Sequence, residues 1–176
     1  MQYETVFDLA EYGYRDGYWF LIGGIVVALA IGGILWQKRR GRRSILAWFL
    51  LVMGLVAGLG GGGVPLWDHH RLVEHLRAGR CLVVEGEVGS HSVERVKSKN
   101  VRSGGYNTST WEAFYVADVA FGFYRGRTPV GFLNGGKTPI DLHDGMRIRI
   151  HYFEDVPGQF DHRRIVRLEI ARGGQA

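Results

Sequence analysis

The sequence has almost no cysteine and contains two long stretches without a charged residue. The chain has a single cysteine, Cys81, so it can form neither an intramolecular disulfide nor a cysteine-rich metal site. Charged residues are absent from Gly17 to Trp36 and again from Ser44 to Trp67. Beyond Asp68 charges recur every few positions. The 176 residues therefore divide into an apolar first part and a polar remainder, and the net charge of +5 comes largely from one short basic cluster.

The first uncharged stretch predicts a membrane-spanning helix over residues 18–36. At about 1.5 Å per residue, a helix of this length matches the roughly 30 Å hydrocarbon core of a bilayer. Tyrosine and tryptophan at its ends suit the aromatic belts of membrane interfaces. A cleaved signal peptide is disfavoured, because the preceding residues are acidic and no small-residue cleavage pattern follows. A hairpin buried in a soluble protein is the weaker alternative.

A second span is expected over residues 44–67. Its helix is expected to lose regularity near Gly60, because four consecutive glycines and Pro65 disfavour helical structure. Gly54 and Gly58 are small residues four positions apart, which predicts close packing within the hairpin or a homo-oligomer through the same glycines. Neither span contains an ionisable residue, so an ion or proton pathway through them is not expected.

The connection between the spans, residues 37–43, predicts their orientation. It carries five basic residues: Lys38, Arg39, Arg40, Arg42 and Arg43. Basic loops collect on the cytoplasmic side, where anionic membrane lipids also attract them. The loop is therefore expected in the cytoplasm, and residues 1–17 form an extracytoplasmic tail. Both termini of this multi-pass protein are then periplasmic, in a bacterial inner membrane.

The rest of the chain predicts a short helix followed by an all-β domain. Residues 68–79 are predicted as a juxtamembrane helix, with Asp68 as its N-cap and Gly79 as its stop. In residues 80–176, several stretches alternate apolar and polar side chains as half-buried strands do. About five strands without a long helix among them predict a small antiparallel barrel, OB-like in form. The polar residues 97–110 are expected to form a loop.

Four stretches of this domain resemble a widespread bacterial family of membrane-anchored small β-domains of unknown function. They are a glycine-bearing first strand, an aromatic strand, a turn with an alternating strand, and a closing strand: Glu85–Val88, Phe114–Phe123, Asp144–Tyr152 and Ile165–Ile170. The resemblance covers about half of the chain. It implies a small barrel and brings no catalytic residues with it, and residues 97–110 depart from it.

No catalytic residue, cofactor or metal ion is expected. The densest group of metal-ligating residue types is His69, His70, Glu74 and His75. Their spacing lacks the zinc-protease pattern and suits a solvated helix beside lipid headgroups. The strand–Ser–helix elbow of serine hydrolases is also absent.

The leading hypothesis is a non-enzymatic, membrane-tethered interaction module that binds another envelope protein or belongs to a membrane complex. The long polar segment suits recognition, and its candidate contact residues are Lys97, Lys99, Arg102, Tyr106 and Trp111. One alternative is a cytoplasmic OB-like domain that binds nucleic acid through aromatics and nearby cations, which a periplasmic placement disfavours. Another is an unrecognised membrane-bound hydrolase, which would need a polar pocket.

Overall fold

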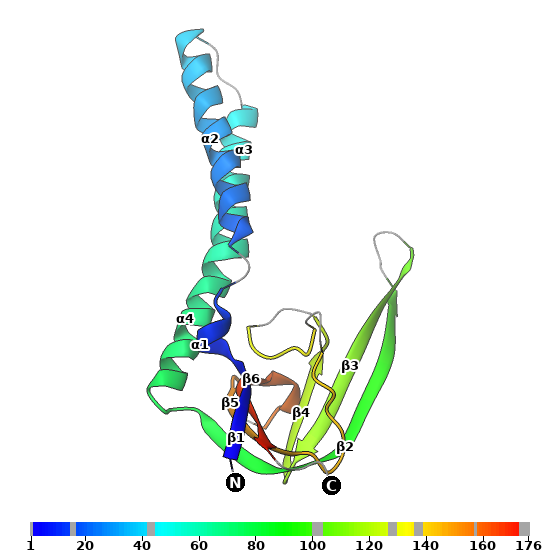
Figure 1. Ribbon diagram of the computed structural model, residues 1–176. Helices are drawn as coiled ribbons and strands as arrows, with labels where there is room; N and C mark the ends of the chain where they lie inside the picture. Colours follow the sequence, from blue (N-terminus) through cyan, green and yellow to red (C-terminus); the bar gives the residue numbers. More distant parts are fainter. Residues whose placement is uncertain are drawn as a thin grey trace. The chain divides into compact units, whose positions relative to one another are not determined.

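A computed structural model describes residues 2–14, 17–41, 45–99, 104–126, 130–135, 139–156 and 158–172. The chain forms two compact units (Figure 1). A helical unit spans Gly13–Arg71, and a β-rich unit combines Met1–Tyr12 with Leu72–Ala176. The helical unit is thus an insertion between the first short segment of the β-unit and the rest of it.

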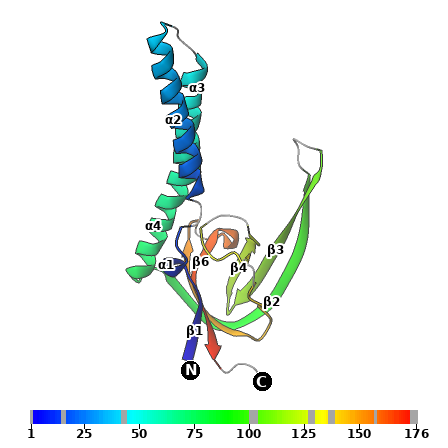
Figure 2. The same ribbon diagram turned by 45° about the horizontal axis from the view of Figure 1, so that its top comes forward.

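Two helices form the hairpin of the helical unit, α2 (Tyr18–Arg39) and α3 (Ile45–Gly58), and they lie side by side in both ribbon views (Figure 2). Glycines occupy their contact. A Cβ atom added to Gly23 would lie 2.7 Å from the Cα of Gly58 and 2.9 Å from the carbonyl oxygen of Gly54. Any larger residue at Gly23 would therefore push the two backbones apart. Gly54 and Gly58 lie at this contact within the hairpin.

A π-helix, η1 (Leu59–Gly63), joins α3 to α4 (Val64–Arg77). The expected loss of regularity near Gly60 is present as this π turn, although the chain stays helical through it. The glycines are accommodated because they make room for aromatic rings of α2: a Cβ on Gly61 would lie 3.0 Å from Cδ2 of Trp19. The wide π turn also interrupts the α-helical hydrogen-bond series just before Pro65, which has no N–H to continue it.

The sequence predicts that a helix begins at Asp68, but α4 begins four residues earlier, at Val64. Asp68 lies inside α4, one turn after its start, and accepts a hydrogen bond from Arg71 at 2.9 Å. The helix follows directly from η1, so it needs no capping residue of its own. Beyond its end, Gly79 has a φ of +65°, and the Arg80 N–H donates to the carbonyl of His75 at 3.0 Å. Glycine adopts this left-handed helix end without steric cost.

The β-unit contains a six-stranded antiparallel sheet with the order β1-β6-β5-β2-β3-β4. Its strands are β1 (Gln2–Asp8), β2 (Leu82–Lys99), β3 (Tyr106–Val116), β4 (Val119–Tyr124), β5 (Arg147–Glu154) and β6 (Arg163–Arg172). Two short helices accompany them, α1 (Leu9–Tyr12) and η2 (Phe160–His162). The sheet is not closed, since β1 and β4 pair on one side only. The predicted five-stranded, OB-like barrel was therefore wrong, although the antiparallel all-β character was right.

The extra strand comes from residues that the sequence predicts as a free N-terminal tail. Strand β1 pairs with β6, from Gln2 opposite Arg172 to Asp8 opposite Arg167. A bidentate ion pair reinforces this pairing, with Arg167 Nη2 2.6 Å and Nε 2.9 Å from Oδ2 of Asp8. Local sequence could not predict the pairing, because the two strands lie at opposite ends of the chain.

The core of the β-unit lies between the inner face of the sheet and the last turns of α4. Its buried side chains include Leu72, Leu76, Phe114, Phe121, Ile148, Ile150 and Leu168. Because side chains alternate along a strand, the opposite face is polar. There Arg149 lies 2.8 Å from Glu85 and 3.5 Å from Glu169, which ties three neighbouring strands together.

Candidate functional site

Strands β2 and β3 continue past the sheet as a two-stranded ribbon (Figures 1 and 2). Strand β2 pairs with β5 only as far as Glu87, and β3 pairs with β4 only from Trp111 onward. Residues 95–99 and 106–110 pair with each other, from Arg95 opposite Thr110 to Lys99 opposite Tyr106. We call these two segments the ribbon.

The ribbon replaces most of the loop that the sequence predicts over residues 97–110, so that prediction was wrong. Its residues are mostly polar on both faces because both faces meet solvent, and it therefore lacks the alternation that identifies a half-buried strand. Residues 100–103, which include the candidate Arg102, lie outside the described residues. The sequence therefore does not predict these strands, because a strand pair exposed on both faces shows no alternation of apolar and polar residues.

Pairing sorts the ribbon side chains into two faces. The basic face carries Arg95, Lys97 and Lys99 on β2, opposite Thr110, Thr108 and Tyr106 on β3. The other face carries Val96 and Ser98, opposite Ser109 and Asn107. Three predicted contact residues, Lys97, Lys99 and Tyr106, therefore lie together, and the Tyr106 side chain is 71% exposed.

Trp111 lies on the opposite face from these three residues. It pairs with Tyr124 of β4, and their ring centroids are 4.7 Å apart. Its indole covers Gly122, where an added Cβ would lie 2.5 Å from Cζ2 of Trp111. The ring of Phe160 also approaches Gly122, with Cε2 3.2 Å from the same added atom. Trp111 is therefore packed onto the sheet, unlike the exposed Tyr106.

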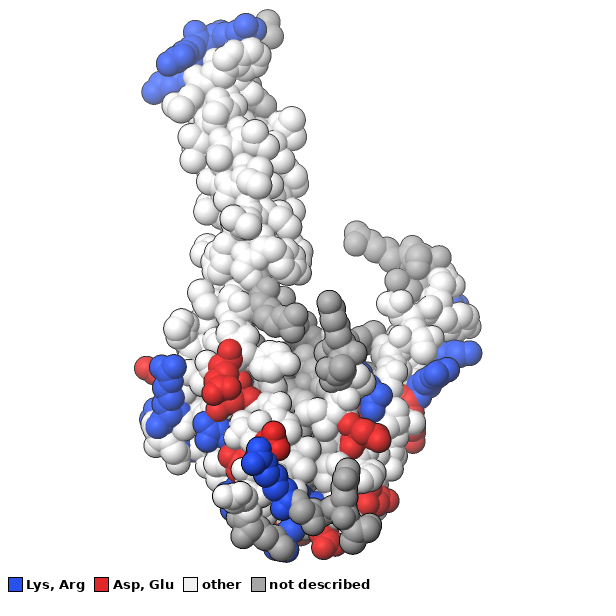
Figure 3. All heavy atoms as spheres, viewed as in Figure 1, with Lys and Arg blue, Asp and Glu red and all other residues white. Residues whose placement is uncertain are grey.

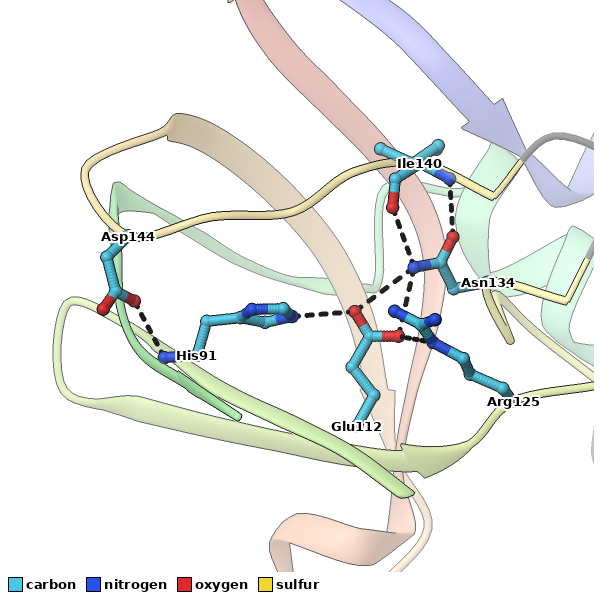
Figure 4. A network of polar contacts seen from close by, with 6 residues as sticks. All are labelled: His91, Glu112, Arg125, Asn134, Ile140 and Asp144. Atoms are coloured by element: carbon cyan, nitrogen blue, oxygen red, sulfur yellow. Dashed lines mark hydrogen bonds and ion pairs between the residues drawn. The ribbon is translucent and has the colours of Figure 1, made fainter. Parts of the chain in front are cut away.

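A buried polar network lies at the root of the ribbon (Figure 4). The side chain of Glu112 is 0% exposed and accepts a hydrogen bond from Arg125 Nε at 2.7 Å. Nε2 of His91 lies 2.9 Å from its other oxygen, and Asn134 Nδ2 lies 3.1 Å and 3.2 Å from the two oxygens. The Asn134 side chain also donates to the carbonyl of Ile140 and accepts from its N–H.

Opposing effects set the ionisation of Glu112. Burial raises the pKa of its carboxyl, but hydrogen bonds from Arg125, His91 and Asn134, together with the Arg125 charge, hold the pKa below its usual value. The same contact raises the pKa of Arg125. Because an ionised carboxylate only accepts hydrogen bonds, His91 must carry a proton on Nε2. Both oxygens of Glu112 are thus engaged, which leaves the carboxylate unsuited to act as a general base in this arrangement.

The network joins four separate segments. His91 comes from β2, Glu112 from β3, Arg125 from the turn after β4, and Asn134 from the segment that leads to β5. The backbone N–H of His91 also donates to Asp144 at 2.8 Å, next to the turn before β5. We infer that the network fixes the direction in which the ribbon leaves the sheet.

The sequence held a signal for this network that was not recognised. In the aromatic strand, Glu112, Phe114 and Val116 fall on the same inward face, and the two apolar residues are buried. A carboxylate in phase with core residues needs hydrogen-bond partners inside the protein. The partners themselves could not be predicted, because His91, Arg125 and Asn134 come from other segments.

Aromatic residues that could stack nucleic-acid bases are divided between the surface and the core: Tyr115 and Tyr124 are 49% and 36% exposed. Phe114 and Phe121 are each 1% exposed, in the core. Arg149 is paired with Glu85 on the outer face, and Arg147 lies 3.9 Å from the same carboxylate. No group of three or more histidine, cysteine, aspartate or glutamate residues is placed to hold a metal ion in the described part of the chain.

Three of the five basic residues predicted to set orientation are described, and they lie at the tip of the helical hairpin. Lys38 and Arg39 end α2, and the Arg40 guanidinium lies 4.1 Å from the centroid of the Trp36 ring. Figure 3 shows these cations beyond a long surface without charge. Arg42 and Arg43 lie outside the described residues.

Comparison with known proteins adds no further assignment. No family model, curated protein or solved structure matches the chain. The resemblance to membrane-anchored β-domains stays a prediction.

Proposed function

We propose that this protein is a non-enzymatic module tethered in a bacterial inner membrane, whose β-unit binds another envelope protein through the ribbon. The ribbon carries the proposal: it extends beyond the sheet, has polar residues on both faces, and is held at its root by a buried network. A segment that is positioned rigidly and packed against no core suits recognition better than structural support.

The apolar surface of the hairpin supports membrane insertion. Two helices are long and apolar enough to cross a bilayer, Tyr18–Arg39 and Ile45–Arg77. Their large apolar side chains face outward, with Leu21 70% and Ile45 90% exposed. Soluble monomers rarely expose contiguous apolar patches larger than a few hundred Å². Lipid tails would cover this surface without any partner protein.

The sheet supports an even number of crossings. Strand β1 precedes the hairpin and β6 follows it, yet the two strands pair directly. Segments that pair in one sheet must lie on the same side of a membrane. The hairpin must then leave that side and return, which two spans accomplish. The basic tip favours the cytoplasm for the turn, and this would place the β-unit in the periplasm.

Topology can be tested with single cysteines in a Cys81→Ser background. Asn107 lies on the ribbon and Gly41 at the hairpin tip, and both are exposed. In intact cells, a membrane-impermeant thiol reagent should label Asn107→Cys, whereas Gly41→Cys should require permeabilisation. The reverse pattern would place the β-unit in the cytoplasm, and labelling of both sites in intact cells would contradict the two-span hairpin.

Partner binding can be tested by photo-cross-linking in cells. A photoreactive phenylalanine analogue would replace Tyr106 on the ribbon or, as a matched control, Tyr115 on the outer face of the sheet. These tyrosines are 71% and 49% exposed on the same strand. We expect a discrete cross-linked protein from position 106 and none from position 115. The same adduct from both positions, or none from either, would contradict the proposed role of the ribbon.

A further inference from the structure

The cations of the ribbon differ from most other described cations of the β-unit, because they have no acidic partner. In the sheet and its turns, arginines pair with carboxylates: Arg125 with Glu112, Arg149 with Glu85, Arg163 with Glu154, Arg164 with Asp155, Arg167 with Asp8 and Arg172 with Glu4. Arg95, Lys97 and Lys99 have no acidic partner among the residues that the structure describes. Only Arg77 and Arg80, beside the end of α4, share this property within the described β-unit.

These three cations form a regular row. They occupy alternate positions of one strand and therefore share a face. At about 3.3 Å per residue, neighbouring cations begin about 6.6 Å apart along the strand. Across from them, Thr110, Thr108 and Tyr106 add three hydroxyl groups to the same face. Figure 3 shows Lys and Arg atoms gathered on the ribbon.

We propose that the basic face of the ribbon binds an extended acidic segment of the partner, in which Asp or Glu recurs at every second residue. The inference builds on the proposed function and specifies the chemistry of the bound surface. An extended chain places alternate side chains at the same interval of about 6.6 Å, so each carboxylate meets one cation. The facing hydroxyls donate to the remaining carboxylate oxygens.

The regular spacing favours a peptide over a lipid surface. Lipid headgroups diffuse and need only a collection of cations in any arrangement, whereas this row has the period of an extended polypeptide. The exposed Tyr106 also offers a ring and a hydroxyl beside the end of the row. Exposed ion pairs are weak individually, so each cation should contribute about a two- to fivefold change in affinity, and the binding should weaken with salt.

The test uses the full-length protein in lipid nanodiscs and two labelled peptides of equal charge. One peptide alternates Glu and Thr, and the other has all Glu residues in one block followed by all Thr residues. Fluorescence anisotropy would give dissociation constants at low and physiological salt. We expect the alternating peptide to bind at least about fivefold more tightly than the block peptide, and its affinity to fall with salt.

Two variants make the result specific. Replacing Arg95, Lys97 and Lys99 with Gln together should weaken binding of the alternating peptide by about tenfold or more. Replacing Arg77 and Arg80 with Gln, which removes two other unpaired cations, should change it less than twofold. Equal binding of both peptides, or an unaffected triple variant, would overturn the proposal. The proposal would also be overturned if the protein bound anionic vesicles but neither peptide, and if the triple variant lost that vesicle binding.

The cross-linking experiment separates this proposal from the proposed function. If the adduct from position 106 persists in the triple variant, the ribbon has a partner but does not recognise it through an acidic segment. If no adduct forms from position 106 but the alternating peptide still binds more tightly than the block peptide, the acidic-segment chemistry stands and the envelope-partner proposal fails.

Discussion

Replacing Glu112 with Gln probes the root of the ribbon most directly. Gln has nearly the same shape but substitutes an amide group for one of the two oxygens that Arg125, His91 and Asn134 contact. If the new amide faces His91, the imidazole can accept from it by carrying its proton on Nδ1. Arg125 then keeps an acceptor at the other oxygen but loses the opposite charge, so the main loss is that of a charge-assisted hydrogen bond.

The expected cost follows from the burial of the two partners. Hydrogen bonds to charged groups contribute about 1.5–3 kcal/mol. Arg125 is 31% exposed and stays partly hydrated, so the lower half of that range applies, about 1.5–2 kcal/mol. Truncation by Glu112→Ala leaves Arg125 and His91 without their carboxylate acceptor, whereas Asn134 keeps the Ile140 carbonyl, and should cost about 3–5 kcal/mol. Both variants should still fold, because small domains are stable by about 5–15 kcal/mol.

Trp111 offers a local signal for the measurement, because the other four of the five tryptophans precede residue 68: Trp19, Trp36, Trp48 and Trp67. With these four changed to Phe, urea unfolding of the detergent-solubilised protein would be followed by Trp111 fluorescence. We expect Glu112→Gln to lower the midpoint by about 1 M, given typical slopes of about 1–3 kcal/mol per molar urea. Glu94→Gln, at an exposed position of β2 just before the ribbon, serves as the control.

The pH dependence has a definite sign. Because the folded-state pKa of Glu112 is lowered, its contribution to stability is fully present above the unfolded carboxyl pKa of about 4.3 and is lost as pH falls through the folded pKa. The difference in the free energy of unfolding between the native protein and Glu112→Gln should therefore be largest above about pH 5 and should become smaller in more acidic solution. A midpoint shift no larger than that of Glu94→Gln at pH 7 would refute a stabilising role for the network.

Three other outcomes test the two units separately. Gly23→Ala should destabilise the helical hairpin in detergent, whereas Gly24→Ala should not, because an added Cβ meets the backbone of α3 only at the first position. Gly122→Ala should displace the indole of Trp111 and change its fluorescence and near-ultraviolet circular dichroism, since the new Cβ would lie 2.5 Å from the ring. A chain with residues 13–71 replaced by a long Gly-Ser linker should yield a folded, soluble β-unit by nuclear magnetic resonance, and aggregation of that chain would contradict the division into two units.

Features with a strong period could be predicted from the sequence. The charge-free stretch over residues 18–36 corresponds to α2, which continues to Arg39. The strands predicted near the C-terminus are present as β5 and β6, because each buries one face and therefore alternates apolar and polar residues. In these segments a single local pattern predicts both the type of secondary structure and the face that is buried.

Features that depend on distant partners could not be predicted. Nothing within residues 2–8 identifies β6 as their neighbour, so β1 was expected to be a tail. The ribbon lacks a buried face and gives no periodic signal. At the candidate site, Lys97, Lys99 and Tyr106 were predicted because they are polar and local, but their shared face depends on the register between β2 and β3. Glu112 was missed because its partners converge only in the folded protein.

The proposed membrane insertion of the hairpin would link anchoring to folding, because the hairpin lies between β1 and the rest of the sheet. Five strands follow the hairpin in sequence and can pair as soon as they are made, but β6 keeps an open edge until β1 joins it. Bringing together segments so distant in sequence carries an entropic cost that grows slowly with the intervening length. A hairpin that crosses a bilayer twice would return the chain to the side from which it left, which lowers this cost. Pairing of β1 with β6 would then require correct insertion, because a hairpin with only one span in place would leave the two strands on opposite sides of the membrane.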